Sequence, residues 1–168
     1  MKILVTVASR HGATKEIGTA IAAVLSAAGH IVDERDPSLV TEVTGYDAVV
    51  LGSAVYTAHW LPTAREFAAR FADDLATRPV WIFSSGLATQ PAARANSPHE
   101  ILALRDKLRA RAHRSFAGRL DRSVLAFTER SIIAGARARE GDHRDFGAIS
   151  VWAGQIATVL AEMVVRTA

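Results

Sequence analysis

The chain has 168 residues, of which 49% are hydrophobic and 22% charged, a balance that is typical of one folded domain and excludes extended disorder. It contains no cysteine, which excludes disulfides, thiolate metal sites, iron–sulfur clusters and thiol catalysis. We expect a single domain over residues 1–168. We also expect it to be cytoplasmic, because the N-terminus predicts a strand rather than a signal peptide and no uninterrupted apolar run approaches a membrane-spanning length.

Positive charge is concentrated late in the chain. The net charge is +3, yet residues 105–139 hold ten arginine and lysine residues against three acidic ones, a local net charge of +7. Such a segment is typical either of a solvated arginine-rich face, which we favour, or of a surface for an anionic partner. We expect no nucleic-acid partner.

Strands and helices alternate along the predicted chain. The hydrophobic pattern predicts strands over residues 3–8, 30–36, 46–52, 78–84 and 113–120. It predicts helices from residue 14 to a C-terminal glycine at 29, over 62–75 and 97–112, from about 121, and from a cap at 145 to the end. This alternation predicts an α/β fold with a doubly wound parallel sheet and helices on both faces.

The first strand runs into the turn Ser9–Thr14 and then into a helix. A strand, a glycine turn and a helix N-terminus together form an anion site, because free backbone N–H groups and the helix dipole point at the same place. Gly12 allows a close approach of the backbone, and the hydroxyls of Ser9 and Thr14 offer hydrogen bonds. The structural alternative is that Gly12 only makes the turn and that Thr14 is only an N-cap.

Two other loops follow strands of the same predicted sheet, so all three meet at its carboxyl edge. The loop over residues 53–60 presents Tyr56, which suits the flank of a planar ring, whereas Trp60 is better interpreted as packing at the start of its helix. The loop that starts at Ser84-Ser85-Gly86-Leu87 offers hydroxyls and backbone N–H groups. A phosphate on one loop and a planar ring between the other two describe a mononucleotide.

Other motifs give weak signals. The six histidines show no paired metal-binding spacing, so we predict no metal site. Motifs of serine hydrolases, P-loop NTPases and dinucleotide-binding proteins are absent from the sequence. Asp142-His143-Arg144-Asp145 precedes a predicted helix, and we interpret it as a turn and cap rather than as an acid–base group.

Four segments carry a resemblance to a known family: Ser9–Thr14, Asp47–Tyr56, Phe83–Gly86 and Phe116–Leu120. They are similar, in order and along nearly the whole chain, to the flavodoxin-like FMN proteins, and within them to the menaquinone-dependent protoporphyrinogen IX dehydrogenase group. The resemblance implies a flavodoxin-like five-stranded parallel sheet with strand order 2-1-3-4-5. It also implies FMN as cofactor.

The resemblance places the FMN phosphate on the first loop and the isoalloxazine ring on the loops after the third and fourth strands. The cofactor-binding residues that it implies are Ser9, Arg10, His11, Gly12, Ala13, Thr14, Ser53, Ala54, Val55, Tyr56, Ser84, Ser85, Gly86 and Leu87. The sequence departs from the commonest family pattern at His11, where many flavodoxins have a hydroxyl residue. Arg10 and His11 therefore either compensate the phosphate charge or point away from it.

The activity implied by the resemblance is that of an FMN-dependent oxidoreductase. It would take electrons from a small redox substrate, such as an anionic porphyrinogen, and pass them to a quinone at a membrane surface, with the protein peripheral to the membrane. The sequence nominates no catalytic acid or base and does not indicate an oligomeric state. Two alternatives stay open: a flavodoxin-type electron carrier, and a flavodoxin-fold binding domain that has lost FMN.

Overall fold

The computed structural model describes residues 1–86, 99–135 and 139–167. The five long strands of its main sheet are all parallel, in the spatial order β2 (Ile31–Arg35), β1 (Lys2–Ala8), β3 (Ala48–Tyr56), β5 (Val80–Gly86) and β6 (Ala112–Ala117). A short strand, β4 (His59–Trp60), pairs antiparallel with β3. The predicted sheet is confirmed, and its order carries different numbers only because β4 intervenes in the chain.

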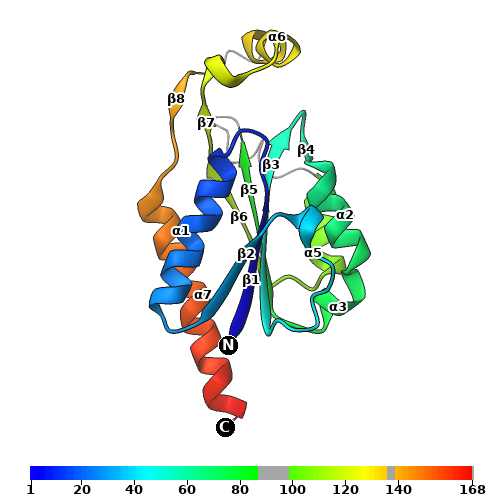
Figure 1. The fold of residues 1–168 in the computed structure, drawn as a ribbon, viewed down its shortest axis with the longest axis vertical. Coiled ribbons are helices and arrows are strands. Elements are labelled where there is room, and N and C mark those ends of the chain that lie inside the picture. Colours follow the sequence, from blue (N-terminus) through cyan, green and yellow to red (C-terminus); the bar gives the residue numbers. More distant parts are fainter. Residues whose placement is uncertain (87–98, 136–138, 168) are drawn as a thin grey trace.

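Helices cover both faces of this sheet (Figure 1). One face carries α1 (Ala13–Ala27) and α7 (Phe146–Thr167), and the other carries α2 (Pro62–Arg70), α3 (Ala72–Ala76) and α5 (His99–Lys107). The β1 strand shows why both faces are covered, because its apolar side chains alternate between two cores: Ile3 and Val5 pack toward α1, and Leu4 packs toward α2. The polar strand β2 lies at the edge, as its sequence predicts.

Among the described residues, α7 is long and apolar enough by length and composition to cross a membrane. Its apolar window within Phe146–Arg166 has a mean hydropathy of 1.6, and 28% of that window is buried. This differs from the expectation that no stretch reaches such a length. Trp152, Ile156 and Leu160 on one side of α7 are buried in the core that α1 and the sheet share. Packing of this kind is typical of an amphipathic helix in a folded domain.

Two predicted boundaries near the carboxyl edge are wrong. The third strand does not end at residue 52, because Ser53 still pairs with β1 and β5, Ala54 pairs with β5, and the strand reaches Tyr56. The predicted loop 53–60 is therefore a hairpin between β3 and β4. The fifth strand ends at Ala117 rather than at residue 120, and the next two residues form a separate strand, β7 (Arg119–Leu120).

Two predicted helices are shorter than expected. The helix from Pro62 is interrupted at Phe71, which has a φ of −108° and separates α2 from α3. The helix predicted to reach residue 112 ends at Lys107, because Arg109 adopts a φ of +50° and Ala112 begins β6. The predicted start of the last helix is confirmed, since the Asp145 carboxylate accepts the Ala148 N–H at 2.9 Å.

An extension stands beyond the carboxyl ends of the strands, at the top of Figure 1. It consists of β7, the 3-10 helix η2 (Arg122–Val124), α6 (Phe127–Gly135) and β8 (Gly141–Asp142), with β7 and β8 paired antiparallel. We call these elements the α6 lobe. The helix predicted from about residue 121 is thus split, and Asp121 caps η2 by accepting the Ser123 N–H at 2.9 Å. Leu120, Leu125 and Ile133 form the small core of the lobe.

Candidate anion and cofactor site

A cavity of about 350 Å³ lies where the carboxyl ends of the strands meet the α6 lobe. Its size is in the range of small-molecule and cofactor sites. Its position follows the general rule for parallel α/β sheets, in which ligands bind beyond the carboxyl ends of the strands. All three loops that the sequence singles out contribute to its wall.

The loop between β1 and α1 forms one end of the cavity, with Ser9, Arg10, His11, Ala13 and Thr14 in the wall. Gly12 lies behind them as the N-cap of α1, with a φ of 84° and no side-chain capping bond. Within the described part of the chain no capping side chain therefore occupies the first N–H groups of α1, and they remain available to an anion. The alternative reading of Thr14 as an N-cap is wrong, because Thr14 is the second residue of the helix and its side chain is buried.

The hairpin after β3 supplies Ala54, Val55 and Tyr56 to the wall. Its two central residues, Thr57 and Ala58, have φ angles of 47° and 64°, a left-handed conformation that two-residue hairpins require and that glycine or asparagine usually provides. Thr57 and Ala58 also line the cavity; they lie in the loop 53–60 that the sequence indicates, but they are not among the predicted cofactor-binding residues. The hairpin thus holds a strained backbone at the rim of the site.

Ser53 and Trp60 stabilise this hairpin through buried hydrogen bonds and packing. The Ser53 hydroxyl is buried, donates to the Ala54 carbonyl at 2.8 Å and accepts the Leu61 N–H at 3.0 Å. Trp60 is 1% exposed, in agreement with its interpretation as a packing residue, and its backbone N–H donates to the Glu100 carboxylate at 2.6 Å. Ser53 therefore holds the loop in place, and the cofactor contact predicted for it stays a prediction.

The end of β5 supplies Ser85 and Gly86 to the wall. The Ser85 hydroxyl is buried and has no hydrogen-bond partner among the described residues. It is therefore an unsatisfied polar group in a residue that lines the cavity. The neighbouring Ser84 hydroxyl is occupied, because it accepts the Trp60 indole N–H at 2.8 Å and lies 2.8 Å from the His113 Nε2 atom. Leu87, the last residue predicted for this loop, lies outside the described residues.

His113, which contacts Ser84 beside the cavity, makes the free energy of unfolding depend on pH. Burial, together with the nearby charge of Arg105, lowers the pKa of His113 from 6.5 to about 4. Between about pH 6.5 and pH 4, His113 is therefore protonated in the unfolded chain and neutral in the folded chain. We expect the free energy of unfolding to fall as the pH drops through this window, by at most about 3 kcal/mol.

The measurement is urea unfolding of the wild type and of His113→Gln at several pH values between 4 and 7.5. Because glutamine does not titrate, the difference in unfolding free energy between the two proteins should change with pH across this window and stay constant above it. Parallel pH profiles for the two proteins would contradict the assignment of the titration to His113.

The α6 lobe forms the rest of the cavity wall. Leu120, Val124, Leu125 and Ile133 make it apolar, and Gly118, Arg119, Asp121 and Glu129 complete it. Of these residues, Gly118, Arg119 and Leu120 lie in the segment Phe116–Leu120 that carries the family resemblance. The lining residues after Leu120 were not predicted from the sequence. No local pattern marks them, since they reach the site through the β7–β8 ribbon and not through a loop that directly follows a strand of the main sheet.

Glu129 connects this lobe to the loop Ser9–Thr14 between β1 and α1, which we call the anion loop after its predicted ligand. Its Oε1 atom lies 3.1 Å from the Arg10 Nε atom and accepts a hydrogen bond from the His11 Nε2 atom at 3.2 Å. Its Oε2 atom accepts the Ala126 N–H at 2.8 Å, and the side chain is 8% exposed. The Ala126 N–H, with His11 and Arg10, lowers the pKa of Glu129 below its usual value. The Arg10 guanidinium also lies over the Tyr56 ring, 5.3 Å from its centre.

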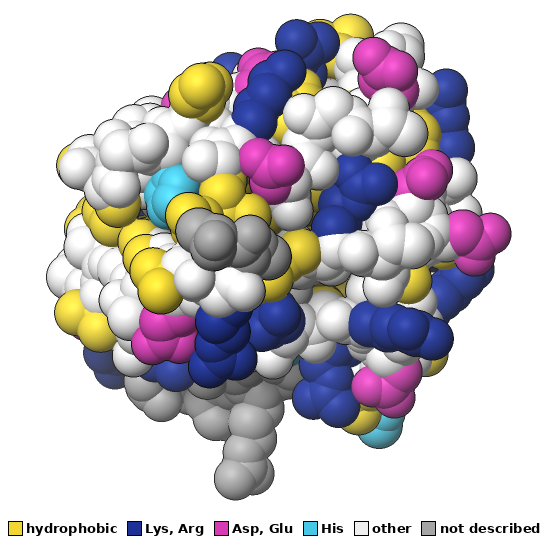
Figure 2. Space-filling view, turned by 90° about the horizontal axis from the view of Figure 1, so that it is seen from below, with side chains coloured by type: hydrophobic (Ala, Val, Ile, Leu, Met, Phe, Trp, Pro, Cys, Tyr) yellow, Lys and Arg dark blue, Asp and Glu magenta, His cyan; other side chains and the backbone are white. Residues whose placement is uncertain are grey.

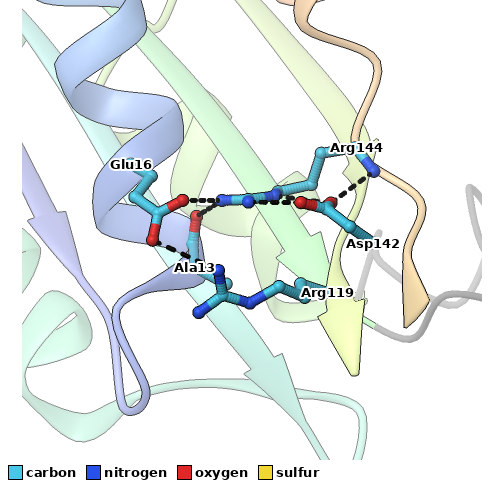
Figure 3. Close-up of polar contacts among 5 residues, drawn as sticks. All are labelled: Ala13, Glu16, Arg119, Asp142 and Arg144. Carbon is cyan, nitrogen blue, oxygen red and sulfur yellow. Dashed lines mark hydrogen bonds and ion pairs between the residues drawn. The ribbon is translucent and has the colours of Figure 1, made fainter. Parts of the chain in front are cut away.

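A second cluster fixes the base of the lobe behind the anion loop (Figure 3). The Arg144 guanidinium is 3% exposed and donates to the Glu16 carboxylate at 2.7 Å and to the Ala13 carbonyl at 2.9 Å. It also pairs with Asp142, and this hydrogen-bonded pairing lowers the pKa of Asp142 to about 2. Arg119 of β7 reaches the same Glu16 at 3.5 Å. The structural role predicted for the segment from Asp142 to Asp145 agrees with these contacts.

Comparison with solved structures shows the same fold in several proteins. A flavodoxin variant from Pseudomonas aeruginosa is 14% identical, with a TM-score of 0.63 over 96% of this chain and 99% of that one. A WrbA-like flavodoxin from Agrobacterium tumefaciens is 11% identical, with a TM-score of 0.61 over 96% and 98%. The rubredoxin oxygen:oxidoreductase of Desulfovibrio gigas is 12% identical, with a TM-score of 0.66, and the match covers 97% of this chain and 37% of that one.

At these identities the structural likeness shows the fold alone. No curated protein matches the sequence at a significant level. A family model described as a flavodoxin domain matches residues 4–146, which is most of the chain and includes the anion loop, the hairpin and Glu129. The chain therefore belongs to the flavodoxin domain family, whose cofactor is FMN.

Proposed function

We propose that this protein is an FMN-dependent oxidoreductase that oxidises an anionic porphyrinogen and passes the electrons to a quinone. The observation that carries the proposal is the cavity, whose wall contains the anion loop, the Tyr56 ring and Ser85, a serine whose hydroxyl has no partner among the described residues. FMN has a terminal phosphate and a flat ring with polar edges, so its two ends match the two ends of this wall.

The residues present fit FMN. The uncapped N–H groups at the start of α1, with the Thr14 side chain beside them, suit the phosphate. Tyr56 suits one side of the ring, and the buried Ser85 hydroxyl suits a polar atom at its edge. When bound, FMN supplies the electron- and hydride-transfer chemistry, and the protein supplies binding, orientation and electrostatics.

The lobe provides the feature that favours an enzyme over a simple electron carrier. Leu120, Val124 and Leu125 continue the cavity as an apolar wall beyond the anion loop and the hairpin, which gives room for an organic substrate and excludes water from it. Arg119 lies in the same wall, at 3.5 Å from the exposed Glu16 carboxylate, and exchange of that surface contact would let it pair with a substrate carboxylate. An apolar macrocycle with carboxylate groups fits this combination.

The test starts from the purified protein, with its visible spectrum and a fluorescence titration with FMN. A colourless protein that does not bind added FMN would overturn the proposal and favour a binding domain that has lost the cofactor. The FMN-loaded protein is then mixed with protoporphyrinogen IX and a soluble quinone, and formation of the porphyrin is followed by fluorescence. Bound FMN without turnover would favour the electron-carrier alternative.

We propose further that the α6 lobe contacts an anionic membrane surface, where a quinone is available. Phe127 is 85% exposed and Val124 is 49% exposed, and the exposed Arg122 and Arg130 flank them in the sequence. An exposed aromatic side chain among arginines is a combination that binds anionic lipid. At the opposite end of the molecule, Lys and Arg side chains are interspersed with Asp and Glu (Figure 2).

We expect the protein to sediment with vesicles that contain anionic lipid and to stay in solution with neutral vesicles. Replacing Phe127 with serine should weaken this binding several-fold, because it removes the exposed apolar side chain without changing the charge. The matched control is Leu39→Ser, because Leu39 is 69% exposed in η1 (Pro37–Leu39), outside the lobe. Equal losses in the two variants would argue against the lobe as the membrane contact.

A further inference from the structure

One carboxylate oxygen of Glu129 contacts two side chains of the anion loop, the Arg10 guanidinium and the His11 imidazole. The Arg10 Nε atom lies 3.1 Å from the Glu129 Oε1 atom, and the His11 Nε2 atom lies 3.2 Å from it. His11 and Glu129 are 118 residues apart in the sequence. The carboxylate is almost fully buried and is fixed from behind by the Ala126 N–H. Within the described residues this is the only ion pair of Arg10, and it joins the α6 lobe to the phosphate end of the cavity.

The pairing has an electrostatic consequence for a ligand that carries a phosphate. A dianion that enters the loop meets an Arg10 guanidinium whose charge the Glu129 carboxylate already compensates. It also meets the field of that carboxylate, which lies in the same cavity wall. The helix N-terminus still attracts the phosphate, but Arg10 adds less to the attraction than it would if it were unpaired.

We propose that Glu129 is a positioning residue that limits how much the phosphate contributes to flavin affinity, by holding Arg10 and His11 away from the anion. The inference rests on the proposed function, since it takes the cavity to be the FMN site. Because the Arg10 guanidinium also lies over Tyr56, the same carboxylate fixes a cation at the junction between the phosphate end and the ring end of the cavity.

The quantity that isolates the phosphate is the ratio of the dissociation constants of riboflavin and FMN, measured by flavin fluorescence. Riboflavin has the same ring and ribityl chain and lacks the phosphate. We expect Glu129→Gln to raise this ratio about five- to tenfold, because the released guanidinium attracts the phosphate, which only FMN carries. Glutamine keeps an oxygen acceptor for the Ala126 N–H. If Glu129→Gln only disturbed the structure of the cavity, it would weaken the binding of riboflavin and of FMN alike and leave the ratio constant.

The matched control is Glu140→Gln, which removes the same charge next to β8 from a carboxylate that accepts the Arg122 N–H. Its ratio should stay within twofold of the wild-type value. Glu129→Asp keeps the charge on a shorter side chain and should raise the ratio less than glutamine does. This variant keeps the proposal testable if Glu129→Gln folds poorly, which loss of riboflavin binding would reveal.

The route through Arg10 is tested by a double-mutant cycle. In an Arg10→Gln background the gain from Glu129→Gln should be at least halved, because the guanidinium that the substitution would release is gone. An undiminished gain would overturn the route through Arg10, and an unchanged or lower ratio in Glu129→Gln alone would overturn the proposal itself. Failure of the wild-type protein to bind either flavin would instead refute the proposed function, so the two failures are distinguishable.

Discussion

Replacing Gly12 with valine should lower FMN affinity at least about 100-fold. Gly12 has a φ of 84°, which a β-branched residue adopts only with strain of about 1–3 kcal/mol. Space does not prevent the substitution, because a Cβ atom at Gly12 has no neighbour within 4 Å. The loop is therefore expected to relieve the strain by changing its backbone angles, which turns the N–H groups of the first turn of α1 away from the cavity.

Gly29 offers a matched control at the other end of the same helix. Its φ is 89°, and a Cβ atom there also has no neighbour within 4 Å. Gly29→Val thus carries a similar strain far along α1 from the cavity, so it should lower the free energy of unfolding while leaving FMN affinity within twofold. Equal FMN affinity in the Gly12 variant and the wild type would contradict the assignment of this loop to the phosphate.

The parallel sheet was predictable because each strand carries its own signal. The strand β1 is apolar without a break and β2 is polar, which places the first inside the sheet and the second at an edge. The same local logic located the anion loop and Tyr56. In these cases the hydrophobic pattern and the turn residues agree with the tertiary structure.

The errors arise where distant pairing decides the structure. The sequence Ser53-Ala54-Val55-Tyr56 is typical of a loop, yet Ser53 pairs with both β1 and β5, and Ala54 pairs with β5. Glu129 is a glutamate in an ordinary helix, and only the fold of the β7–β8 ribbon brings it to Arg10 and His11. Ser84 shows the reverse case, since its hydroxyl is occupied by Trp60 and His113 below the cavity.

Gly118 links the sheet to the lobe, and its replacement with alanine should destabilise the protein by about 2–4 kcal/mol. A Cβ atom there would lie 2.4 Å from the Gly86 carbonyl oxygen and 3.2 Å from its carbon. Both neighbours are backbone, and the sheet holds them through the pairing of Gly86 with Ala117. The clash is therefore expected to push the ends of β5 and β6 apart rather than to be absorbed by a flexible side chain.

Because Gly86 and Gly118 both line the cavity, the same displacement should also weaken FMN binding in the folded fraction. Gly154→Ala is the control, since Gly154 lies within α7 and a Cβ atom there has no neighbour within 4 Å. That variant should be neutral or more stable by about 1 kcal/mol, as alanine is the better helix former. Urea unfolding with FMN titration measures both quantities. A Gly118→Ala protein as stable as the wild type would show that the junction between sheet and lobe tolerates a wider spacing, and the cavity would then not depend on the close approach of these two glycines.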